Sequence, residues 1–329
     1  MRLNIAYSSD NNYVKHVGVS MTSLFLNNVK AEEIYIYLVD NGISAENKEK
    51  LIEIADKYNR NLIFIKFNEL CGGLETDNSY PLSSYARLFL SKIEGIDKII
   101  YMDCDSIICS SLEQLWNIDI EEYYVSGVLD NVNEYYKTSI GLDKNFKYIN
   151  AGFLVINLKK WRNDNLERKF IDFINKYKGS VPHHDQGTIN AVCKEKIYII
   201  HPKYNLQPPM LNFTEKEILK LDDINEYYSQ TELDEAKQNP CFIHFTNGFY
   251  NRPWNIDSTH PLKDVYLYYL NQTIWKNRLE NKKLCRNARI MRFLYNNIPF
   301  GFYIIIHKLL VKRKIRKLKI NENTKVKLC

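Results

Sequence analysis

The chain has 329 residues, 45% of them hydrophobic and 13% aromatic, and this composition excludes a disordered or low-complexity protein. Its formal net charge of +6 is unevenly distributed, because residues 276–329 contain 16 Lys and Arg against two Glu, which leaves a net charge of −8 for the rest. An acidic body with a basic tail does not fit a nucleic-acid-binding domain, whose positive charge covers a folded face, so we expect no nucleic-acid partner.

Strand and helix patterns alternate through the first 260 residues. Apolar or alternating segments predict strands, and segments with helical spacing predict helices, one of which follows the N-cap residue Ser44. The predicted strands are 3–7, 33–40, 61–67, 98–102, 123–129, 150–157 and 241–245, and the predicted helices are 14–26, 45–58, 82–90 and 161–177. The short connections favour an α/β fold with a mainly parallel sheet covered by helices.

Several common signals are absent from the sequence. It contains neither GxGxxG nor the P-loop pattern, so the usual glycine-rich phosphate-binding loops are missing. The seven cysteines form no CxxC pair, and reduced thiols are the plain expectation. The opening segment MRLNIAYSSD lacks the apolar core of a secretory signal, so we expect a cytoplasmic protein.

Two aspartates, Asp103 and Asp105, follow the apolar strand 98–102 in the segment IIYMDCDSII. Residues two apart in an extended segment point to the same side, so both carboxylates can address one ligand. Paired carboxylates suit Mn²⁺ or Mg²⁺, which often keep substrate phosphates as further ligands. The alternative is that one aspartate only caps the following turn.

A histidine, His244, follows the last predicted strand in HFTNGFYNRPW. A single histidine after an apolar strand is more often structural, but an imidazole beside the two carboxylates would favour Mn²⁺ over Mg²⁺. The turn at Gly248 and the guanidinium of Arg252 offer a place for a phosphate oxygen.

The chain resembles the family 8 glycosyltransferases, retaining enzymes with the GT-A fold, and among them the bacterial lipopolysaccharide galactosyl- and glucosyltransferases. The resemblance covers roughly residues 3–260 and rests on seven segments in the expected order: SSDNNY, SSYARLFL, IIYMDCD, YINAGFLVINLKKW, HHDQGTIN, KYNLQP and HFTNGFYNRPW. It implies a Rossmann-like GT-A catalytic domain at residues 1–260, with a mixed, mainly parallel sheet, and a basic helical segment at residues 261–329.

The resemblance implies a UDP-hexose donor that carries galactose or glucose. Asp103, Asp105 and His244 would bind Mn²⁺, with Mg²⁺ as the alternative, and the ion would bridge the two phosphates of the donor. Cys104, between the two aspartates, is also expected to belong to the donor-binding site, and we expect its side chain to point away from the donor into the core.

The segment SSDNNY, which begins at Ser8, resembles a nucleotide-binding segment. In it Asp10 and Asn12 would contact the uracil or the ribose, and Tyr13 would stack on the base. Taken without the other motifs, the same residues fit an Asx-rich turn with a packing tyrosine.

The residues expected around the donor sugar come from three places in the chain. Arg87 in YARL resembles the arginine that reaches the sugar or phosphate, and its alternative is a surface helix residue with salt-bridge partners. Asn150, Ala151 and Gly152 resemble the stretch that lines the sugar, where glycine permits close approach. Asp130, a candidate catalytic residue at a strand end, would meet the donor sugar or the acceptor.

Asp185 and Gln186 in HHDQG match the catalytic pair beside the anomeric carbon, although Asp185 also fits the N-cap of the next helix. Because glutamine is a poor nucleophile, we favour attack on the same face as the leaving group over a covalent intermediate on Asp185. In the last motif Asn247 and Gly248 join the donor site. Arg252 replaces the family's usual lysine, which keeps a phosphate clamp but with bidentate geometry.

The tail combines an apolar run with a basic one. Residues 298–311, IPFGFYIIIHKLLV, are followed by KRKIRKLK. The apolar run is too short to span a bilayer, which takes about 20 residues, so an amphipathic segment on an anionic membrane surface fits better. The resemblance agrees, because related transferases act on lipid-linked acceptors at the cytoplasmic membrane. The alternatives are a helix packed on the core and a disordered nucleic-acid-binding arm.

The sequence therefore predicts a retaining transferase that moves a hexose from UDP to a saccharide or glycolipid acceptor of a cell-surface glycan such as lipopolysaccharide. Two other functions stay open. A phosphohydrolase would use Asp103 as nucleophile and Asp105 as acid. A non-enzymatic module would bind the sugar nucleotide without turnover.

Overall fold

The computed structural model describes residues 1–72, 74, 82–246 and 249–327. Its strands are β1 (Arg2–Ser9), β2 (Glu33–Asp40), β3 (Asn61–Lys66), β4 (Lys98–Met102), β5 (Ser106–Ile108), β6 (Val125–Leu129), β7 (Ile149–Asn157), β8 (Ile197–Ile199) and β9 (Phe242–His244). Each predicted strand is therefore confirmed, with ends that shift by one or two residues.

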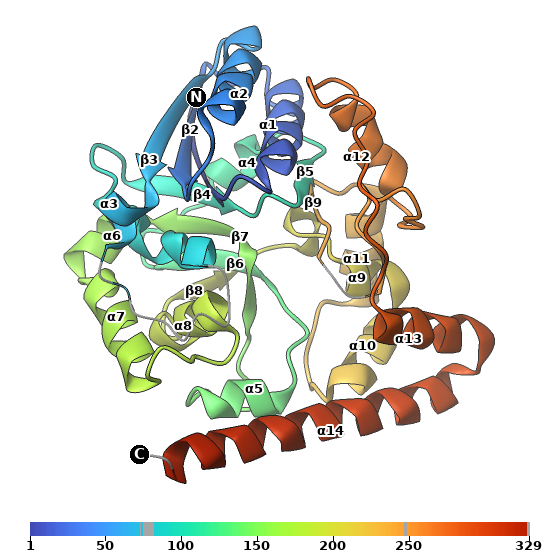
Figure 1. Cartoon of the computed structure of the whole chain (residues 1–329). Coiled ribbons are helices and arrows are strands. Elements are labelled where there is room, and N and C mark those ends of the chain that lie inside the picture. Colours follow the sequence, from blue (N-terminus) through green and yellow to red (C-terminus); the bar gives the residue numbers. More distant parts are fainter. Residues whose placement is uncertain (73, 75–81, 247–248, 328–329) are drawn as a thin grey trace.

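Seven strands form one mixed sheet in the order β3-β2-β1-β4-β7-β6-β8 (Figure 1). β1 is parallel to β2 and β4, β2 to β3, and β6 to β8, while β7 is antiparallel to both β4 and β6. Residues 149–156 of β7 are all buried, as expected for a strand with helices on both faces. The predicted α/β fold with a mainly parallel sheet is confirmed.

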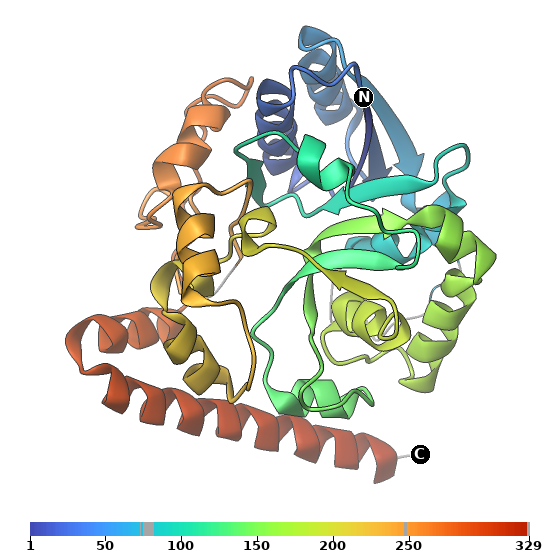
Figure 2. The same cartoon turned by 180° about the vertical axis from the view of Figure 1, so that it is seen from behind.

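Helices cover both faces of this sheet (Figures 1 and 2). Leu3, Ile5 and Tyr7 of β1 point into a core shared with α1 (Val14–Asn27) and α2 (Ala45–Lys57). On the opposite face Ala6 joins a second core, which contains residues of the 3₁₀ helix η1 (Leu82–Lys92) and of α6 (Leu158–Asn163), α7 (Leu166–Lys176) and α8 (His184–Val192). The remaining helices are α3 (Phe67–Cys71), α4 (Glu113–Trp116), α5 (Glu134–Ser139), η2 (Pro202–Tyr204), α9 (Pro208–Asn212), α10 (Glu215–Asp222), α11 (Gln230–Gln238), α12 (Lys263–Leu270), α13 (Arg286–Asn297) and α14 (Phe300–Lys327).

Two predicted helices differ from the structure in type or length. The segment predicted as a helix at 82–90 is helical, but it is a 3₁₀ helix of unusual length. The helix predicted at 161–177 is two helices, because the backbone of Asn165 takes a left-handed conformation with φ 53° between them. Asparagine tolerates that conformation better than most residues, which explains the break. The first of the two helices starts early because the Asn157 side chain accepts a hydrogen bond from the Lys160 N–H at 2.9 Å.

A second, two-stranded sheet brings distant motifs together. β5 and β9 are antiparallel, with Ser106 opposite His244, and Leu206 of the KYNLQP segment bridges to Ile243. These backbone contacts bring the segments IIYMDCD, KYNLQP and HFTNGFYNRPW together beside the carboxyl end of β4.

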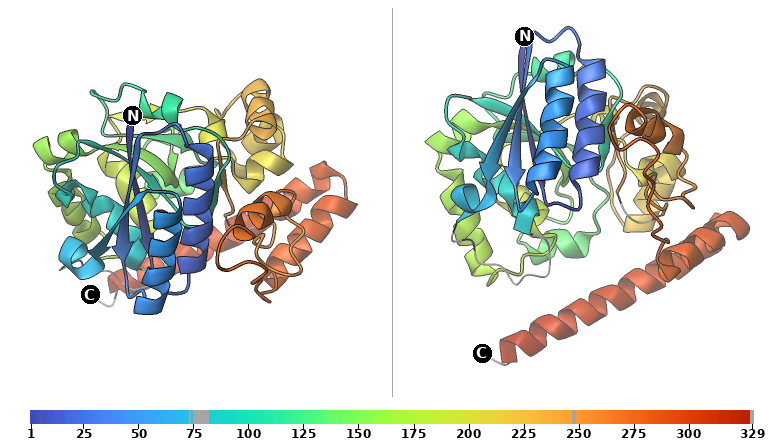
Figure 3. Two further views of the ribbon diagram at one scale, coloured as in Figure 1. Left: turned by 90° about the horizontal axis from the view of Figure 1, so that it is seen from above. Right: turned by 45° about the horizontal axis from the view of Figure 1, so that its top comes forward.

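The chain after residue 260 continues to pack on the residues before it. Tyr266 and Leu270 of α12 are buried, and α12 contacts α1. α14 is a long helix along one end of the molecule, next to α10 and α13 (Figures 1 and 3). Tyr303 is buried and Lys308 pairs with Asp223, so the first half of α14 rests on the core. The division at residue 260 stays a prediction.

Candidate active site

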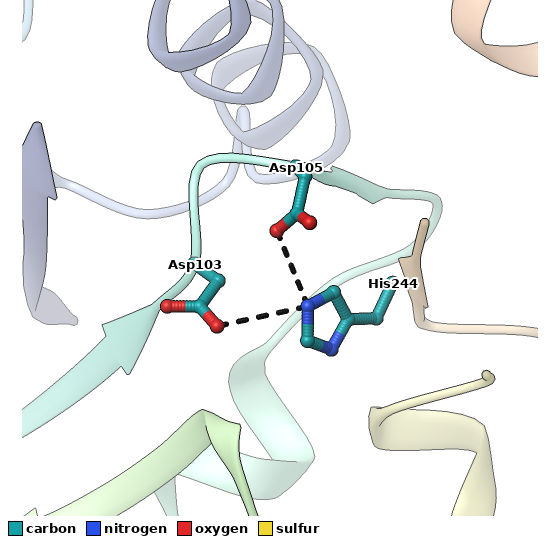
Figure 4. Close-up of side chains that lie close together, drawn as sticks. All are labelled: Asp103, Asp105 and His244. Carbon is teal, nitrogen blue, oxygen red and sulfur yellow. Dashed lines mark ion pairs between the residues drawn. The ribbon is translucent and has the colours of Figure 1, made fainter. Parts of the chain in front are cut away.

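The two predicted metal-binding motifs meet where the two sheets adjoin. Asp103 follows β4, Asp105 precedes β5, and His244 is the last residue of β9. The N–H of Phe245 donates to the carbonyl of Asp105 at 2.9 Å, which fixes the two segments together. Figure 4 shows the side chains of Asp103, Asp105 and His244 pointing toward one another.

The geometry of these three side chains suits a divalent cation. Their ligand atoms lie within 4.8 Å of one another, and His244 Nε2 lies 3.2 Å from Asp105 Oδ1 and 3.7 Å from Asp103 Oδ2. A Cβ atom on Gly152 would come within 2.1 Å of the His244 ring and 2.8 Å of Asp103 Oδ2, so only glycine leaves room for the cluster. Two carboxylates and one imidazole form a donor set that fits Mn²⁺.

Arg252 balances the charge of the more deeply buried aspartate. Its guanidinium contacts Asp105 Oδ2 and the carbonyl oxygen of Phe245. Burial alone would raise the pKa of the Asp105 carboxyl, but Arg252 and His244 outweigh it and hold that pKa well below its usual range. Asp105 is therefore a carboxylate at neutral pH, ready to bind a cation.

Arg87 links the metal cluster to α8. Its Nη2 lies 2.8 Å from Asp103 Oδ1 and its Nε lies 2.9 Å from Asp185 Oδ2. The guanidinium also contacts the Ala151 carbonyl and lies 4.2 Å from the centre of the Tyr101 ring. Arg87 is buried, so it is an internal cross-link of the site and not a surface helix residue.

The HHDQG segment forms a tight turn that leads into α8. His183 and His184 both have left-handed backbones, with φ 58° and 53°, a conformation that side chains other than glycine seldom adopt. A Cβ on Gly187 would lie 2.0 Å from the Pro182 carbonyl oxygen, so the turn requires glycine there. The N-cap is His183, so the alternative in which Asp185 caps the helix is wrong.

The carboxyl of Asp185 is enclosed by protein. Burial raises its pKa to about 6, although the neighbouring Arg87 opposes the rise. Burial of a carboxyl beside a charged partner is one of the ways in which active sites shift pKa values.

Asp130, Asn150 and Gln186 share a set of hydrogen bonds. Asn150 Nδ2 and Gln186 Nε2 each donate to Asp130 Oδ2 at 3.0 Å, and the Ala151 N–H donates to Gln186 Oε1 at 3.0 Å. The structure thus brings Asp130 together with Gln186. Asp130 also faces a cavity of about 320 Å³, whose other lining residues include Lys137, Lys147, Tyr148, Asn225 and Tyr227.

The predicted nucleotide-binding segment forms an Asx turn after β1. Asp10 Oδ1 accepts the N–H of Asn12 at 2.9 Å and the N–H of Tyr13 at 3.2 Å. The Tyr13 side chain is 39% exposed, so its ring is accessible for stacking. Ser8 is buried, and its hydroxyl donates to the carbonyl of Ser83 at 2.7 Å.

Three further residues, Cys104, Asn247 and Gly248, were predicted to belong to the donor site. Cys104 is buried in the core, with its Sγ 3.2 Å from the carbonyl oxygen of Ser8. Asn247 and Gly248 lie outside the described residues.

Two residues of the site were not singled out in the sequence. Tyr101 lies beneath the Arg87 guanidinium, and Asn205 hydrogen-bonds both Asn150 and His244. Asn205 stands in the KYNLQP segment, and the only available signal was its place in that motif. Tyr101 stands in the segment IIYMDCD, two residues before Asp103, and that place was its only signal in the sequence.

Comparison with known proteins identifies the family of the chain. The sequence matches the model of glycosyl transferase family 8 over residues 4–258. General stress protein A of Bacillus subtilis is 29% identical over 279 residues, which cover 83% of this chain and 94% of that protein. Lipopolysaccharide 1,2-glucosyltransferase of Escherichia coli is 26% identical over 283 residues, which cover 83% of this chain and 79% of that protein.

A solved structure shares the fold. The galactosyltransferase LgtC, in complex with donor and acceptor sugar analogues, superposes with a TM-score of 0.69 at 23% identity, over 88% of this chain and 99% of that chain. The expected GT-A fold is confirmed by this likeness and by the mixed sheet. Because the family model covers well over half of the sequence, the chain belongs to glycosyl transferase family 8.

Proposed function

We propose that the protein is a metal-dependent retaining hexosyltransferase. It moves galactose or glucose from a UDP-sugar to a saccharide or glycolipid acceptor of a cell-surface glycan such as lipopolysaccharide. The observation that carries this proposal is the direct link, through Arg87, between Asp103 of the proposed metal site and Asp185. A relative named as a lipopolysaccharide glucosyltransferase supports the choice of acceptor class.

Three side chains would hold the metal ion. Asp103, Asp105 and His244 supply two carboxylates and an imidazole, and the imidazole favours Mn²⁺ over Mg²⁺. A bound ion would act as a Lewis acid that stabilises the charge of the departing diphosphate. Arg252, beside Asp105, is in position to share that task through a phosphate oxygen.

The UDP moiety would lie along the turn after β1. In this arrangement Asp10 and Asn12 contact the uracil or ribose, and the exposed Tyr13 ring stacks on the base. The sugar would lie against Asn150, Ala151 and Gly152, next to the metal cluster, whose His244 ring and Asp103 carboxylate occupy the space beside Gly152.

The surroundings of Asp185 and Gln186 support attack on the same face as the leaving group. Asp185 is held by Arg87, and the amide of Gln186 is engaged by Ala151 and Asp130. In the reaction the bond from the anomeric carbon to the phosphate oxygen breaks, and a bond to the acceptor hydroxyl oxygen forms on the same face. The phosphate takes the hydroxyl proton. A sugar adduct trapped on Asp185 would overturn this mechanism.

The acceptor would enter from the cavity beside Asp130. This cavity of about 320 Å³ has a mixed lining of tyrosine, lysine and amide groups, which suits a saccharide. Asp130 would contact the incoming hydroxyl groups, while its other neighbours, Asn150 and Gln186, adjoin the donor side.

The C-terminal helices would hold the protein on the inner face of the cell membrane. In the described part of the chain, no helix has the length and apolar character needed to cross a bilayer. Phe302, Ile305 and Leu309 recur at helical spacing on α14 and are exposed, and exposed Lys312 and Arg316 continue the same stripe. An apolar stripe that continues into a basic one suits an anionic lipid surface.

The proposed activity is tested with the full chain and three donors, UDP-Glc, UDP-Gal and UDP-GlcNAc. We expect Mn²⁺-dependent release of UDP from one of the first two, with loss of activity in EDTA and partial leakage to water without acceptor. Hydrolysis of p-nitrophenyl phosphate that ignores nucleotides would favour a phosphohydrolase instead. Tight binding of UDP-sugar with no UDP release would favour a binding module.

A further inference from the structure

A continuous row of side-chain amides connects the sugar-facing residues to the metal cluster. Asn205 is fully buried at its centre, with Nδ2 2.9 Å from Asn150 Oδ1 and Oδ1 3.2 Å from His244 Nδ1. The backbone fixes this position, because Leu206 pairs with β9 and accepts the His244 N–H at 2.9 Å.

At the end of the row away from His244, two hydrogen bonds fix which side-chain atom of Asn150 is the oxygen and which is the nitrogen. The backbone N–H of Gly152 can only donate, and it donates to Asn150 Oδ1 at 2.9 Å. The carboxylate of Asp130 can only accept, and it accepts from Asn150 Nδ2 at 3.0 Å. The amide of Asn150 therefore cannot be reversed without losing both bonds.

The orientation of the Asn150 amide determines the orientation of the Asn205 amide, and this in turn determines which nitrogen of His244 carries a hydrogen atom. Since Asn150 Oδ1 accepts, the group of Asn205 that faces it must be the NH₂ group, and the group that faces His244 must be the carbonyl oxygen. A carbonyl oxygen cannot donate, so the hydrogen atom between Asn205 and His244 belongs to Nδ1 of the imidazole. In the neutral ring Nε2 then carries the lone pair, and Nε2 faces Asp105 and Asp103.

We propose that Asn205 is a positioning residue that holds His244 in the Nδ1–H tautomer, with the Nε2 lone pair directed at the divalent cation. The inference rests on the proposed function, because it assigns a supporting partner to one of the proposed metal ligands. Metal-binding histidines commonly have such a partner on the other ring nitrogen, and its loss typically weakens metal binding 10–100-fold. The row also ties the orientation of His244 to Asp130, on the acceptor side of the site.

Metal binding by full-length variants tests the proposal. Asn205→Leu has no acceptor for the Nδ1–H, and we expect its Mn²⁺ dissociation constant, measured by calorimetry, to rise about 10–100-fold. Asn205→Asp keeps an acceptor, and we expect it to bind Mn²⁺ at least as tightly as the wild type. Asn28→Leu is the matched control, because Asn28 is also buried and is hydrogen-bonded to Leu24 and Leu112, which are not residues of the site.

The role of Asn205 is also read from the imidazole ¹⁵N signals of His244 in the metal-free protein. We expect Nδ1 of the wild type to carry a hydrogen-bonded proton, whether or not Nε2 also shares a proton with Asp105, and we expect that hydrogen bond to be lost in Asn205→Leu. An unprotonated Nδ1 in the wild type, wild-type Mn²⁺ binding by Asn205→Leu, or equal losses in the Leu and Asp variants would each overturn the proposal. If the wild type binds no Mn²⁺, the proposed metal function fails, and the ¹⁵N signals still decide the role of Asn205.

Discussion

Arg87 and Asp185 form an ion pair inside the protein, with Nε 2.9 Å from Oδ2 and both side chains 6% exposed. Removing one partner of a buried pair leaves an uncompensated charge, which costs about 3–5 kcal/mol. We expect Arg87→Leu to lower the free energy of unfolding by about this amount at pH 8. The loss should be smaller at pH 5, because Asp185 has a pKa of about 6 even beside Arg87 and is then largely protonated. Urea denaturation at the two pH values measures both effects.

The control for this variant is Arg168→Leu. Arg168 forms an exposed pair with Asp172 one helical turn away, and such pairs contribute about 0.3–0.5 kcal/mol. A loss for Arg87→Leu that is the same at pH 5 and pH 8 would contradict the assignment to Asp185.

Gly152→Ala should disable the metal cluster without unfolding the protein. The added Cβ would lie 2.1 Å from His244 Cε1, so the imidazole must move away from the two aspartates. We expect Mn²⁺ affinity and UDP release to fall at least tenfold, of the order seen when metal-site support is lost. Gly301→Ala is the control, since a Cβ there meets nothing within 4 Å. Unchanged Mn²⁺ binding in Gly152→Ala would show that the cluster does not hold the ion.

Asp222 gives the protein a predictable dependence of stability on pH. Burial raises its pKa to about 7, and the hydrogen bond from Asn131 offsets only part of the rise. The same carboxyl ionises near pH 4 in an unfolded chain, so this group's stabilisation is complete below about pH 4 and is lost as the pH rises to about 7. We expect Asp222→Asn to raise the free energy of unfolding by about 1–2 kcal/mol at pH 8 and to change it little at pH 4.5.

The neighbouring substitution Asp223→Asn serves as the comparison. Asp223 pairs with Lys308 and is exposed, so its replacement should give no gain at pH 8. Equal effects of Asp222→Asn at the two pH values would rule out the raised pKa as their cause.

The exposed apolar side chains of α14 should be required for binding to a membrane surface. Phe302, Ile305 and Leu309 are 64%, 57% and 62% exposed, so their replacement by serine removes apolar surface without opening the core. We expect the triple variant to lose most of its co-sedimentation with vesicles that contain anionic lipid, while UDP release on a soluble acceptor is kept. Ile52→Ser, at an exposed apolar position on α2, is the control. Undiminished sedimentation of the triple variant would remove the helix from the membrane model.

Local sequence patterns predicted the main sheet except the short strand β8, and they predicted α1, α2, η1 and the region of α6 and α7, because strands such as β4 and β7 are short apolar runs whose character is visible without tertiary context. They failed at Asn165, where one left-handed residue divides a helix. They also missed Asn205, whose role depends on its distance from His244 and Asn150 in space. Contacts of this kind depend on which strands are neighbours in the fold, and the hydrophobic periodicity of a single segment does not predict which strands become neighbours.

The contact between Arg252 and Asp105 has a thermodynamic consequence for ligand binding. Asp105 Oδ1 faces His244 in the cluster while Oδ2 contacts Arg252, so the guanidinium repels a cation bound to the same carboxylate, which makes binding of the metal alone weaker. A diphosphate offers the guanidinium a new anionic partner. We therefore expect positive cooperativity, in which UDP tightens Mn²⁺ binding and Mn²⁺ tightens UDP binding by the same factor, a reciprocity that paired titrations can check. Arg252 thereby makes the nucleotide and the ion bind as a unit.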